Sequence, residues 1–520
     1  MQKKERDTWG SSFGFMMAAI GSAVGLGNIW GFPHKMGKSG GFVFLLVYII
    51  LAVFVGYALM CSELAVGRKT QSGPVHAYKA LSKKFGWIGW LAVLAPYMIL
   101  SFYTVLGGYC AQYLALNLTE LSFGLQKTYS ITLTGGETFV AMLTNPFGSA
   151  AFTLLFILVC YLINKSNVSE GIEKFNKIGM PCLAIMLVII IIRSVTLPYA
   201  EEGLKFMFLP GYAVKAGFIS ESPSLISVLA TAGGQMFFSL SVAMGINVTY
   251  GSYLPKTENL KKSAFVIVAA DTVVALLAGI AVIPAAVANG IANGTPVSEI
   301  ALGGPKLLFV TLQDVFAQMG TFGPLFGVIF YALVLIAAVS SAIALQEVIA
   351  TFLIDNAESK GKSVNRAKVS LGVSIAVAVE ALFVAVDGLG ASGIFTFWGT
   401  DAWNDCLLDF MDCWSEGISL PLGALLMALL VGWELKVKPV QDELEIGSEH
   451  SDAFNKFYSF CIRFSTPIAM AFIFSGSVSG FFTQISLFGM DSTTLGYILG
   501  VIVLIVGFVV ANSGSSKTTK

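Results

Sequence analysis

Long apolar stretches separated by short polar segments run through the whole sequence. A stretch of about 20 apolar residues is long enough for a helix to cross the hydrocarbon core of a bilayer. The pattern predicts about twelve such spans, and the fourth and the ninth are the shortest. They lie near residues 11–34, 42–66, 88–118, 149–163, 178–197, 225–252, 263–288, 322–354, 370–386, 407–434, 457–478 and 492–512.

Two of these spans contain polar residues and glycines where a membrane helix is normally most apolar. GSAVGLGNIWGFP at 21–33 breaks the first span through Gly21, Gly25 and Gly27, and FFSLSVAMGIN at 237–247 breaks the sixth. Small residues alone also suit the close packing of two helices. Because the spans are five apart, equivalent helices in two halves of the chain would run in opposite directions. Paired interruptions of this kind indicate a transporter built from inverted repeats, with its binding site near the middle of the membrane.

The composition agrees with a membrane protein and excludes several other classes. Hydrophobic residues make up 56% of the chain and charged residues only 12%, and the mean hydropathy is +0.78. Soluble domains carry about 25% charged residues. The formal net charge of zero provides no positive field for nucleic acid. The histidines at 34, 76 and 450 have no nearby nucleophile or metal set, so we expect no enzyme.

Lys and Arg are concentrated in alternate connections between the spans. Most of the 31 basic residues lie on the side of the N-terminus, whereas the opposite loops contain few. Cytoplasmic loops of membrane proteins carry this excess. We therefore expect a multi-pass protein of the plasma membrane (the inner membrane in a bacterium) with both termini in the cytoplasm. The basic segments are the N-terminus, 68–84, 165–177, 256–262, 360–368, 436–463 and the C-terminus.

The motifs of these spans resemble one known family over nearly the whole chain. RDTWGSSFGFMMAAIGSAVGLGNIWGFP is similar to the first helix of the neurotransmitter:sodium symporters, SFYTVLGGY to the third and GQMFFSLSVAMGINVTYGSYLPKTENL to the sixth, and AAVSSAIALQE and LLDFMDCW also match. Bacterial amino-acid transporters are the most similar members. The resemblance implies an all-α integral membrane protein with the leucine-transporter fold, in which helices 1 and 6 are unwound. Two inverted five-helix repeats are implied at 1–200 and 201–435, with two peripheral helices and a tail at 436–520.

The resemblance implies a sodium-coupled symporter that imports a neutral amino acid by alternating access. Amine-carrying relatives have an aspartate where this chain has Gly25, so the substrate is expected to bring its own carboxylate. Ala243, where many relatives have glycine, favours a small or medium aliphatic side chain. Two alternatives remain open. One is an amino-acid sensor or receptor without net transport, and the other is a proton-coupled or cationic amino-acid carrier with Asp271, Asp412 and Glu416 as candidate relays.

Unwound backbone in a membrane is tolerated where it faces protein or a cavity, and its carbonyls are hard ligands for a cation. The resemblance implies two sodium sites built from such oxygens, although serines also occur at plain helix contacts. The first site comprises Ala23, Asn28, Ser239 and Asp271 with the substrate carboxylate, and the second comprises the carbonyls of Gly21, Val24 and Ala337 with the hydroxyls of Ser340 and Ser341.

The resemblance also implies a substrate site next to the sodium sites. The substrate carboxylate is expected on the amides of Leu26 and Gly27 and on the Tyr103 hydroxyl, with Phe238 as a lid above it. The apolar members of the set are equally suited to an ordinary core. The remaining lining residues are Ser22, Ala23, Ile99, Ser239, Ser241, Met244, Ser341 and Leu345.

Asp271 lies at the start of the seventh span, where an acidic residue is expensive and functional by default. A helix-terminal carboxylate is the simpler alternative. The family resemblance puts Asp271 at the first sodium site, where chloride-dependent members have asparagine, and Tyr48, Gln235 and Ser239 match the chloride ligands. We therefore expect Asp271 to substitute for the charge of chloride. The expected partners are an amino acid, sodium ions and the bilayer, without chloride or nucleic acid, and monomer and homo-oligomer both remain open.

The resemblance implies a gate at the cytoplasmic end of the pathway. Arg6 and Trp9 match one side of this gate, with Asp355 and Tyr253 as partners. An ion pair at this point is able to lock one state and release in another, whereas an ordinary surface salt bridge contributes only about 0–1 kcal/mol. Glu63 is expected to cap the unwound first helix.

Gly31 is a departure from the family pattern. Relatives usually have an arginine there, which pairs across the outer vestibule with the acid that matches Asp412. Here the arginine is missing, Asp412 remains, and Glu416 lies one turn further along the same helix face. We expect Lys35, one turn outward from Gly31, to replace the arginine. The alternative is that the two acids meet a cationic substrate side chain.

Overall fold

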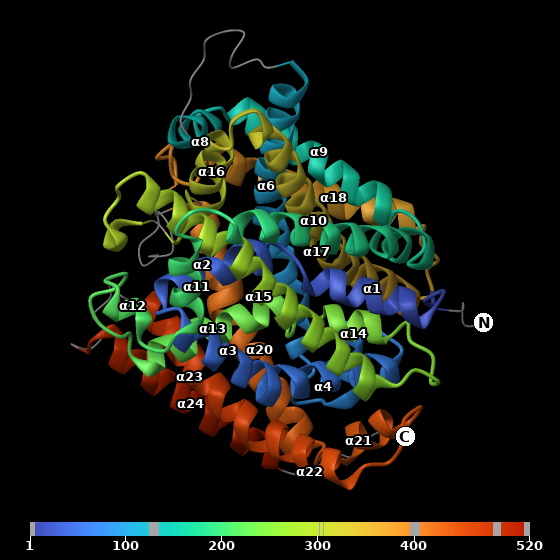
Figure 1. The fold of residues 1–520 in the computed structure, drawn as a ribbon. Coiled ribbons are helices and arrows are strands. Elements are labelled where there is room, and N and C mark those ends of the chain that lie inside the picture. The colour runs from blue at the N-terminus through green and yellow to red at the C-terminus, as the bar shows by residue number, and fades with distance from the viewer. Residues whose placement is uncertain are drawn as a thin grey trace.

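The described parts of the chain are almost entirely helical in the computed structural model, which describes residues 6–123, 135–300, 302–304, 306–395, 406–481 and 490–513 (Figure 1). Short π-helical turns continue several of the helices, among them η1 (Gly27–Gly31), η3 (Ser169–Glu173), η5 (Leu307–Thr311) and η7 (Cys413–Ser419). The α-helices are α1 (Ser12–Ala23), α2 (Phe32–Lys38), α3 (Phe42–Leu51), α4 (Tyr57–Thr70), α5 (Pro74–Leu81), α6 (Ile88–Phe123), α8 (Gly135–Leu143), α9 (Pro146–Asn164), α10 (Lys174–Val195), α11 (Ala200–Phe208), α12 (Tyr212–Lys215), α13 (Leu225–Leu240), α14 (Ile246–Gly251), α15 (Leu260–Ala292), α16 (Leu312–Gln318), α17 (Gly323–Ser359), α18 (Arg366–Asp387), α19 (Leu407–Asp412), α20 (Leu420–Leu429), α21 (Lys438–Glu445), α22 (Asp452–Phe460), α23 (Thr466–Phe481) and α24 (Ser492–Asn512).

The spans expected from the apolar pattern are present. Within the described residues, ten helices are long and apolar enough to cross a membrane, and α1 with η1 and α2 forms an eleventh span that is bent by 45°. The shorter α13 is followed, after an interruption, by α14 where the sixth span is expected. Each of the twelve apolar runs therefore corresponds to a helix or to an interrupted helix pair.

Both interruptions are shorter than the sequence predicts. The second one covers only residues 241–245 rather than 237–247, because α13 continues to Leu240. Ser241, Ala243 and Gly245 adopt left-handed backbone conformations with φ of 53°, 63° and 68°. Such φ values are uncommon for residues with a side chain. The backbone of this interruption is therefore held in place by its surroundings rather than by local preference.

Gly21 does not interrupt the first span, although the sequence suggests that it does. It lies inside α1, and a Cβ atom at this position would be 2.0 Å from Oδ1 of Asn176 on α10. Gly21 thus permits the close approach of two helices, which is the usual role of small residues in membrane helices. The helix breaks three residues later, over 24–26.

The interrupted helices meet inside the bundle. The first half of the broken pair, α1, contacts α13, α14 and α17, while the two longest helices, α6 and α17, pack against each other along the middle (Figure 1). The peripheral helices α23 and α24 pack against each other at the edge. This arrangement surrounds both breaks with protein, which is the condition for unpaired backbone in a membrane.

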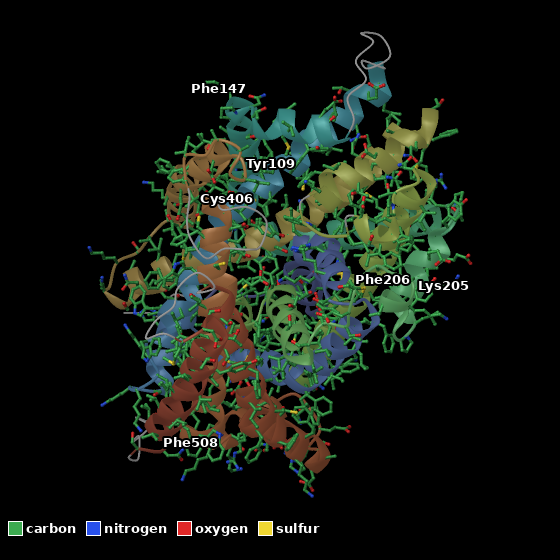
Figure 2. All side chains as sticks on the ribbon, turned by 90° about the vertical axis from the view of Figure 1, so that its left-hand side faces the viewer. Tyr109, Phe147, Lys205, Phe206, Cys406 and Phe508 are labelled. Atoms are coloured by element: carbon green, nitrogen blue, oxygen red, sulfur yellow. The ribbon has the colours of Figure 1, made fainter. Side chains whose placement is uncertain are left out.

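Large apolar side chains cover the outside of the bundle. Phe147 and Phe508 project from the surface with 87% and 41% of their area exposed, whereas Tyr109 and Cys406 are buried (Figure 2). Soluble proteins rarely expose so many apolar side chains in continuous areas. The exposed apolar surface is therefore the part that faces the lipid.

Candidate functional site

The site lies where the two interruptions face each other. The hydroxyls of Ser241 and Ser341 both donate to the carbonyl of Ser22, at 3.0 and 3.1 Å. This carbonyl belongs to the last turn of α1, where the break removes the backbone donors that would normally satisfy it. Side chains of α17 and of the second interruption thus replace helical hydrogen bonds of the first.

A cavity with about 290 Å³ of empty space lies between the interruptions. Ten of the twelve predicted substrate residues line it, while Leu26 and Ser239 do not. Gly25 and Ile246 also contribute to the lining, although the sequence does not identify them as substrate contacts. The predicted residues on the lining are Ser22, Ala23, Gly27, Ile99, Tyr103, Phe238, Ser241, Met244, Ser341 and Leu345.

The Leu26 amide is held at one edge of this cavity. It donates to the Tyr103 hydroxyl at 3.0 Å, and the Tyr103 ring lies 6.4 Å from the ring of Phe238. Leu26 and Tyr103, which the sequence predicts as carboxylate ligands, are therefore adjacent, and Phe238 lies beside Tyr103.

The cavity wall carries no formal charge. None of its described lining residues is acidic or basic. A Cβ atom on Gly25 would be 2.3 Å from Oγ of Ser341 and 2.7 Å from the Tyr103 hydroxyl. A side chain at position 25 would therefore occupy the space beside Tyr103 that a ligand needs.

Asp271 is fully buried well inside α15 rather than at its end, which excludes the helix-terminal alternative. Its carboxylate accepts hydrogen bonds from the Asn28 side-chain amide at 2.7 Å, from Ser239 at 2.9 Å and from the Tyr48 hydroxyl at 3.2 Å. Gln235 does not join this group, because its amide donates to the Gly27 carbonyl at 2.6 Å. Asn28, Ser239 and Asp271, three of the residues predicted for the first sodium site, are thus brought together around one buried carboxylate.

The predicted second site consists of neutral oxygens. The Gly25 amide donates to Oδ1 of Asn28 at 3.1 Å, so it does not extend the helix by bonding to the Gly21 carbonyl. Ser340 donates to the Ala337 carbonyl at 2.8 Å. Carbonyl and hydroxyl oxygens suit a hard cation. These oxygens therefore fit an alkali cation, and the described residues contain no His, Cys, Asp and Glu cluster that would hold a transition metal. All five members of this group are buried: Gly21, Val24, Ala337, Ser340 and Ser341.

Comparison with known proteins decides the family. The model of the sodium:neurotransmitter symporter family matches residues 6–132 and 141–515. The chain belongs to the sodium:neurotransmitter symporter family. This symporter is 32% identical over 476 residues to the sodium-dependent transporter YhdH of Bacillus subtilis, covering 91% of this chain and 98% of the relative. It is 29% identical over 449 residues to the sodium-dependent transporter MJ1319 of Methanocaldococcus jannaschii, covering 83% of each chain.

A solved structure has the same architecture. The crystal structure of MhsT in complex with L-phenylalanine matches with a TM-score of 0.78 and 31% identity, covering 91% of this chain and all of that one. The expected family and its fold of unwound helices are thereby confirmed. The protein is a sodium-dependent membrane transporter rather than an enzyme.

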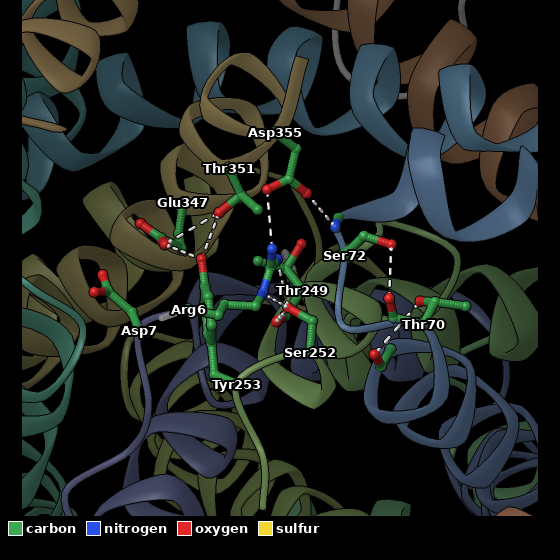
Figure 3. A network of polar contacts seen from close by, with 12 residues as sticks. Arg6, Asp7, Thr70, Ser72, Thr249, Ser252, Tyr253, Glu347, Thr351 and Asp355 are labelled. Atoms are coloured by element: carbon green, nitrogen blue, oxygen red, sulfur yellow. Dashed lines mark hydrogen bonds and ion pairs between the residues drawn. The ribbon is translucent and has the colours of Figure 1, made fainter. Parts of the chain in front are cut away.

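At one end of the symporter, Arg6 is the centre of a polar network, here called the Arg6 network (Figure 3). Its guanidinium pairs with Asp355 at 2.9 Å and donates to Ser252 at 2.7 Å, and it lies 5.0 Å from the centre of the Tyr253 ring. The Gly73 amide donates to the second oxygen of Asp355 at 2.6 Å. The network therefore joins the N-terminal segment to α5, α14 and α17.

The aromatic residues predicted for this gate are part of the same assembly. The indole of Trp9 donates to the Tyr250 carbonyl at 3.1 Å and lies 6.3 Å from the Tyr253 ring. The Tyr253 hydroxyl donates to Glu347 at 2.7 Å (Figure 3). Arg366 pairs with the same carboxylate. Glu347 and Arg366 extend the network beyond the residues that the sequence identifies.

Glu63 caps the second interruption, so the expectation that it caps the first helix is wrong. Its carboxylate accepts from the Ala243 amide at 2.8 Å and from the Asn247 side chain at 3.1 Å. Ala243 lies in the break between α13 and α14, and Asn247 lies in the first turn of α14. The fully buried carboxylate thus satisfies backbone that this break leaves open.

At the other end of the symporter, Lys35 pairs with Glu416 rather than with Asp412. The side chains of Lys35 and Glu416 retain 22% and 14% exposure. Position 31 faces a different residue, because a Cβ atom on Gly31 would be 2.9 Å from Oε1 of Gln235. Lys35 therefore forms an ion pair with the second of the two acids instead of the expected pair with Asp412.

Proposed function

We propose that this symporter imports a neutral amino acid with a small or medium aliphatic side chain, driven by sodium. The uncharged cavity wall is the observation that carries this proposal. A substrate held there needs its own carboxylate to balance sodium, and Gly25 leaves space for that carboxylate beside Tyr103. MhsT, which has the same architecture, was solved with L-phenylalanine. Ile99, Met244 and Leu345 provide an apolar surface for the side chain.

Two sodium ions are proposed, one in each oxygen cluster. The first ion lies beside Asp271, Asn28 and Ser239, with the Ala23 carbonyl and the substrate carboxylate completing its shell. The second takes the carbonyls of Gly21, Val24 and Ala337 and the hydroxyls of Ser340 and Ser341. Shared contact with the first ion couples substrate binding to sodium binding.

Asp271 makes chloride unnecessary in this proposal. Its carboxylate lies within hydrogen-bond distance of Asn28, Ser239 and Tyr48, so a fixed negative charge is already available beside the first ion. A chloride ion held by Tyr48 and Ser239 would lie directly against this carboxylate and would be repelled by it. The proposed transport is therefore independent of chloride.

Alternating access is proposed to run between the two ends of the molecule. The Arg6 network closes the proposed cytoplasmic end, and the Lys35–Glu416 pair with Phe238 closes the proposed outer end. The proposed membrane is the plasma membrane, with both termini in the cytoplasm, and the proposed repeats span 1–200 and 201–435, followed by 436–520.

The energy available from sodium is sufficient for concentrative uptake. Each ion moved by a potential of about 100 mV gains about 2.3 kcal/mol, and a gradient of about tenfold adds about 1.4 kcal/mol. Two ions supply roughly 7 kcal/mol, which supports about 10⁵-fold accumulation of a zwitterion, whereas one ion supports a few hundredfold.

Uptake into proteoliposomes tests the proposal. Radiolabelled alanine, leucine, phenylalanine and lysine are offered with an inward sodium gradient, with potassium in its place, and with an inward proton gradient. We expect sodium-dependent accumulation of an aliphatic amino acid. Binding without accumulation would indicate a sensor, and acid-stimulated uptake without sodium would indicate a proton-coupled carrier. Preference for lysine would indicate a cationic carrier, although Glu416 is already paired with Lys35.

A further inference from the structure

The segment 302–304, which lies between α15 and α16 in the chain, is fastened to the second half of the broken first span. The backbone amide of Gly304 donates to Nδ1 of His34 on α2 at 2.5 Å. The carbonyl of Gly304 accepts from the indole of Trp30 on η1 at 3.1 Å. Trp30 and His34 are one helical turn apart, so two side chains of the same span hold one residue of the segment at once. These two contacts are here called the Gly304 latch.

Glycines allow the segment to lie directly against α2. A Cβ atom on Gly37 would be 2.2 Å from the carbonyl oxygen of Leu302, and a Cβ atom on Gly303 would be 2.9 Å from Nδ1 of His34. Leu302 and His34 are both buried, with 7% and 9% of their area exposed. The closed latch therefore covers the imidazole and keeps it from the surrounding solution.

The hydrogen bond to Gly304 requires a neutral His34. A neutral imidazole has one nitrogen that accepts a hydrogen bond, whereas the protonated ring has two donors and no acceptor. Nδ1 accepts from the Gly304 amide, so it carries no proton. A proton added at Nδ1 would point one N–H group at another and would leave the buried amide of Gly304 without its acceptor. The closed latch is therefore incompatible with the charged ring.

The charged groups around the imidazole also fit its neutral form. Lys35 and Lys38 of α2 are the cations beside it. The facing acid is Glu416 of η7, which is already paired with Lys35. A proton on the imidazole would therefore add a third positive charge to one short stretch of helix. α13 also contacts α2 and contains no titratable side chain, and the titratable side chains on the other two contacting helices are Tyr48 on α3, and Asp271, which is bonded to Tyr48, Lys261 and Lys262 on α15.

We propose that the Gly304 latch is a proton-sensitive device, closed while His34 is neutral and opened when His34 takes up a proton from the solution on its side of the membrane. The segment 302–304 then separates from α2. A histidine in water has a pKa of about 6.5. Because only the open latch takes up the proton, the ratio of open to closed latch rises as the pH falls below about 6.5 and is constant well above it. The assignment of this side to the outside rests on the proposed function.

The accessibility of a cysteine in the segment tests the latch without any substrate. Leu302→Cys at a buried position and Ser298→Cys at an exposed position of η4 (Val297–Glu299) are made in a protein that lacks cysteines 182 and 413. Each reacts with a charged maleimide, and the ratio of the two rates cancels the effect of pH on the thiol itself. We expect this ratio to rise about tenfold between about pH 7.5 and about pH 5.5, as one proton on the open form gives. A ratio that does not change would overturn the proposal.

Variants assign the response to the imidazole. His34→Asn places a carbonyl oxygen near the position of Nδ1 but does not titrate, so the ratio should stay low at both pH values. His34→Leu removes the acceptor, and the ratio should be high at both. His450→Asn is the matched control, because His450 is exposed and pairs with Glu445 and Asp452 far along the chain, and it should keep the tenfold response. A tenfold response that persists in His34→Asn, or a low ratio in His34→Leu, would refute the assignment.

Amino-acid affinity at the same two pH values separates the latch from the proposed function. If the latch closes the outer end of a symporter, acid should weaken binding in the natural chain by more than in His34→Asn. Labelling that responds to acid in a protein that binds none of the offered amino acids would contradict the proposed function and would still support the latch. Labelling that does not respond to acid, in a protein that binds an amino acid, would overturn the latch alone.

Discussion

The side-chain amide of Asn28 donates to the carboxylate of Asp271 at 2.7 Å, in the fully buried centre of the bundle. This contact joins the broken first span to the seventh span. Asn28 turns its oxygen the other way, toward the Gly25 amide at 3.1 Å. A single side chain therefore links the fixed negative charge to the unwound backbone, so a change at Asp271 affects the ion site and the break together.

Chloride dependence is the first prediction that follows from Asp271. Replacement of chloride by gluconate should change the uptake rate of the natural chain by less than about twofold, because the carboxylate already supplies the negative charge. Asp271→Asn removes this charge, so its uptake should fall at least about tenfold in gluconate and recover partly in chloride. Asp491→Asn is the control, because Asp491 is an exposed N-cap that asparagine also serves. If uptake by the Asp271→Asn variant is the same in chloride and in gluconate, Asp271 does not replace the charge of chloride.

Gly25 tests the assignment of the cavity. Gly25→Ala adds a Cβ atom 2.3 Å from Oγ of Ser341 and should weaken amino-acid binding at least about fivefold, because overpacking costs about 1–3 kcal/mol. Gly372→Ala is the matched control, since nothing lies within 4 Å of a Cβ atom at this position of α18. Isothermal titration in sodium measures both affinities. Equal affinity of the two variants would mean that the ligand lies elsewhere.

The sequence predicts the helices well because their signal is local. Runs of apolar residues define the spans, and clusters of glycine and serine mark both interruptions. The extent of an interruption is harder to predict, because Ser241 and Ala243 adopt left-handed conformations that their own types do not favour. Those conformations depend on contacts with other helices, which a single sequence does not contain.

The errors at Glu63 and Asp412 have the same origin. A buried acid in the second span is recognisable as a cap, but whether it faces the first or the sixth helix depends on how the helices rotate against each other. Asp412 and Glu416 share one helix face, so the sequence does not determine which of them Lys35 contacts. Ile246 is missed because it follows the break, where no helical periodicity indicates its direction.

The Arg6 network should control access from its end of the molecule. Arg6→Ala removes the contacts to Asp355 and Ser252, which together contribute roughly 2 kcal/mol and therefore about a thirtyfold change in population. The test replaces the buried Ala19 by cysteine in a protein that lacks the accessible cysteines 182 and 413. This cysteine should react faster with a charged maleimide when Arg6 is replaced by alanine than when Arg6 is present.

Lys438→Ala provides the comparison for Arg6→Ala. It removes an exposed pair between Lys438 and Asp442, whose side chains are 80% and 55% exposed. Such exposed pairs contribute little to stability. The labelling rate of Lys438→Ala should therefore match that of the protein in which Arg6 is unchanged. If Arg6→Ala is labelled at the same rate as Lys438→Ala, the Arg6 network does not control access to the cavity.

The Lys35–Glu416 pair gives the sharpest test of the departure at Gly31. Lys35→Ala and Glu416→Gln should each speed substrate release several-fold, because either change opens the same partly buried contact. In a double-mutant cycle, Lys35 with Glu416 should show a coupling of about 1 kcal/mol or more, and Lys35 with Asp412 less than about 0.5 kcal/mol. Lys215→Ala, which removes an exposed cation, should leave release unchanged. Stronger coupling to Asp412 would mean that Lys35 reproduces the pairing expected of the arginine at position 31. Stronger coupling to Glu416 would mean that the Lys35–Glu416 pair is a different contact.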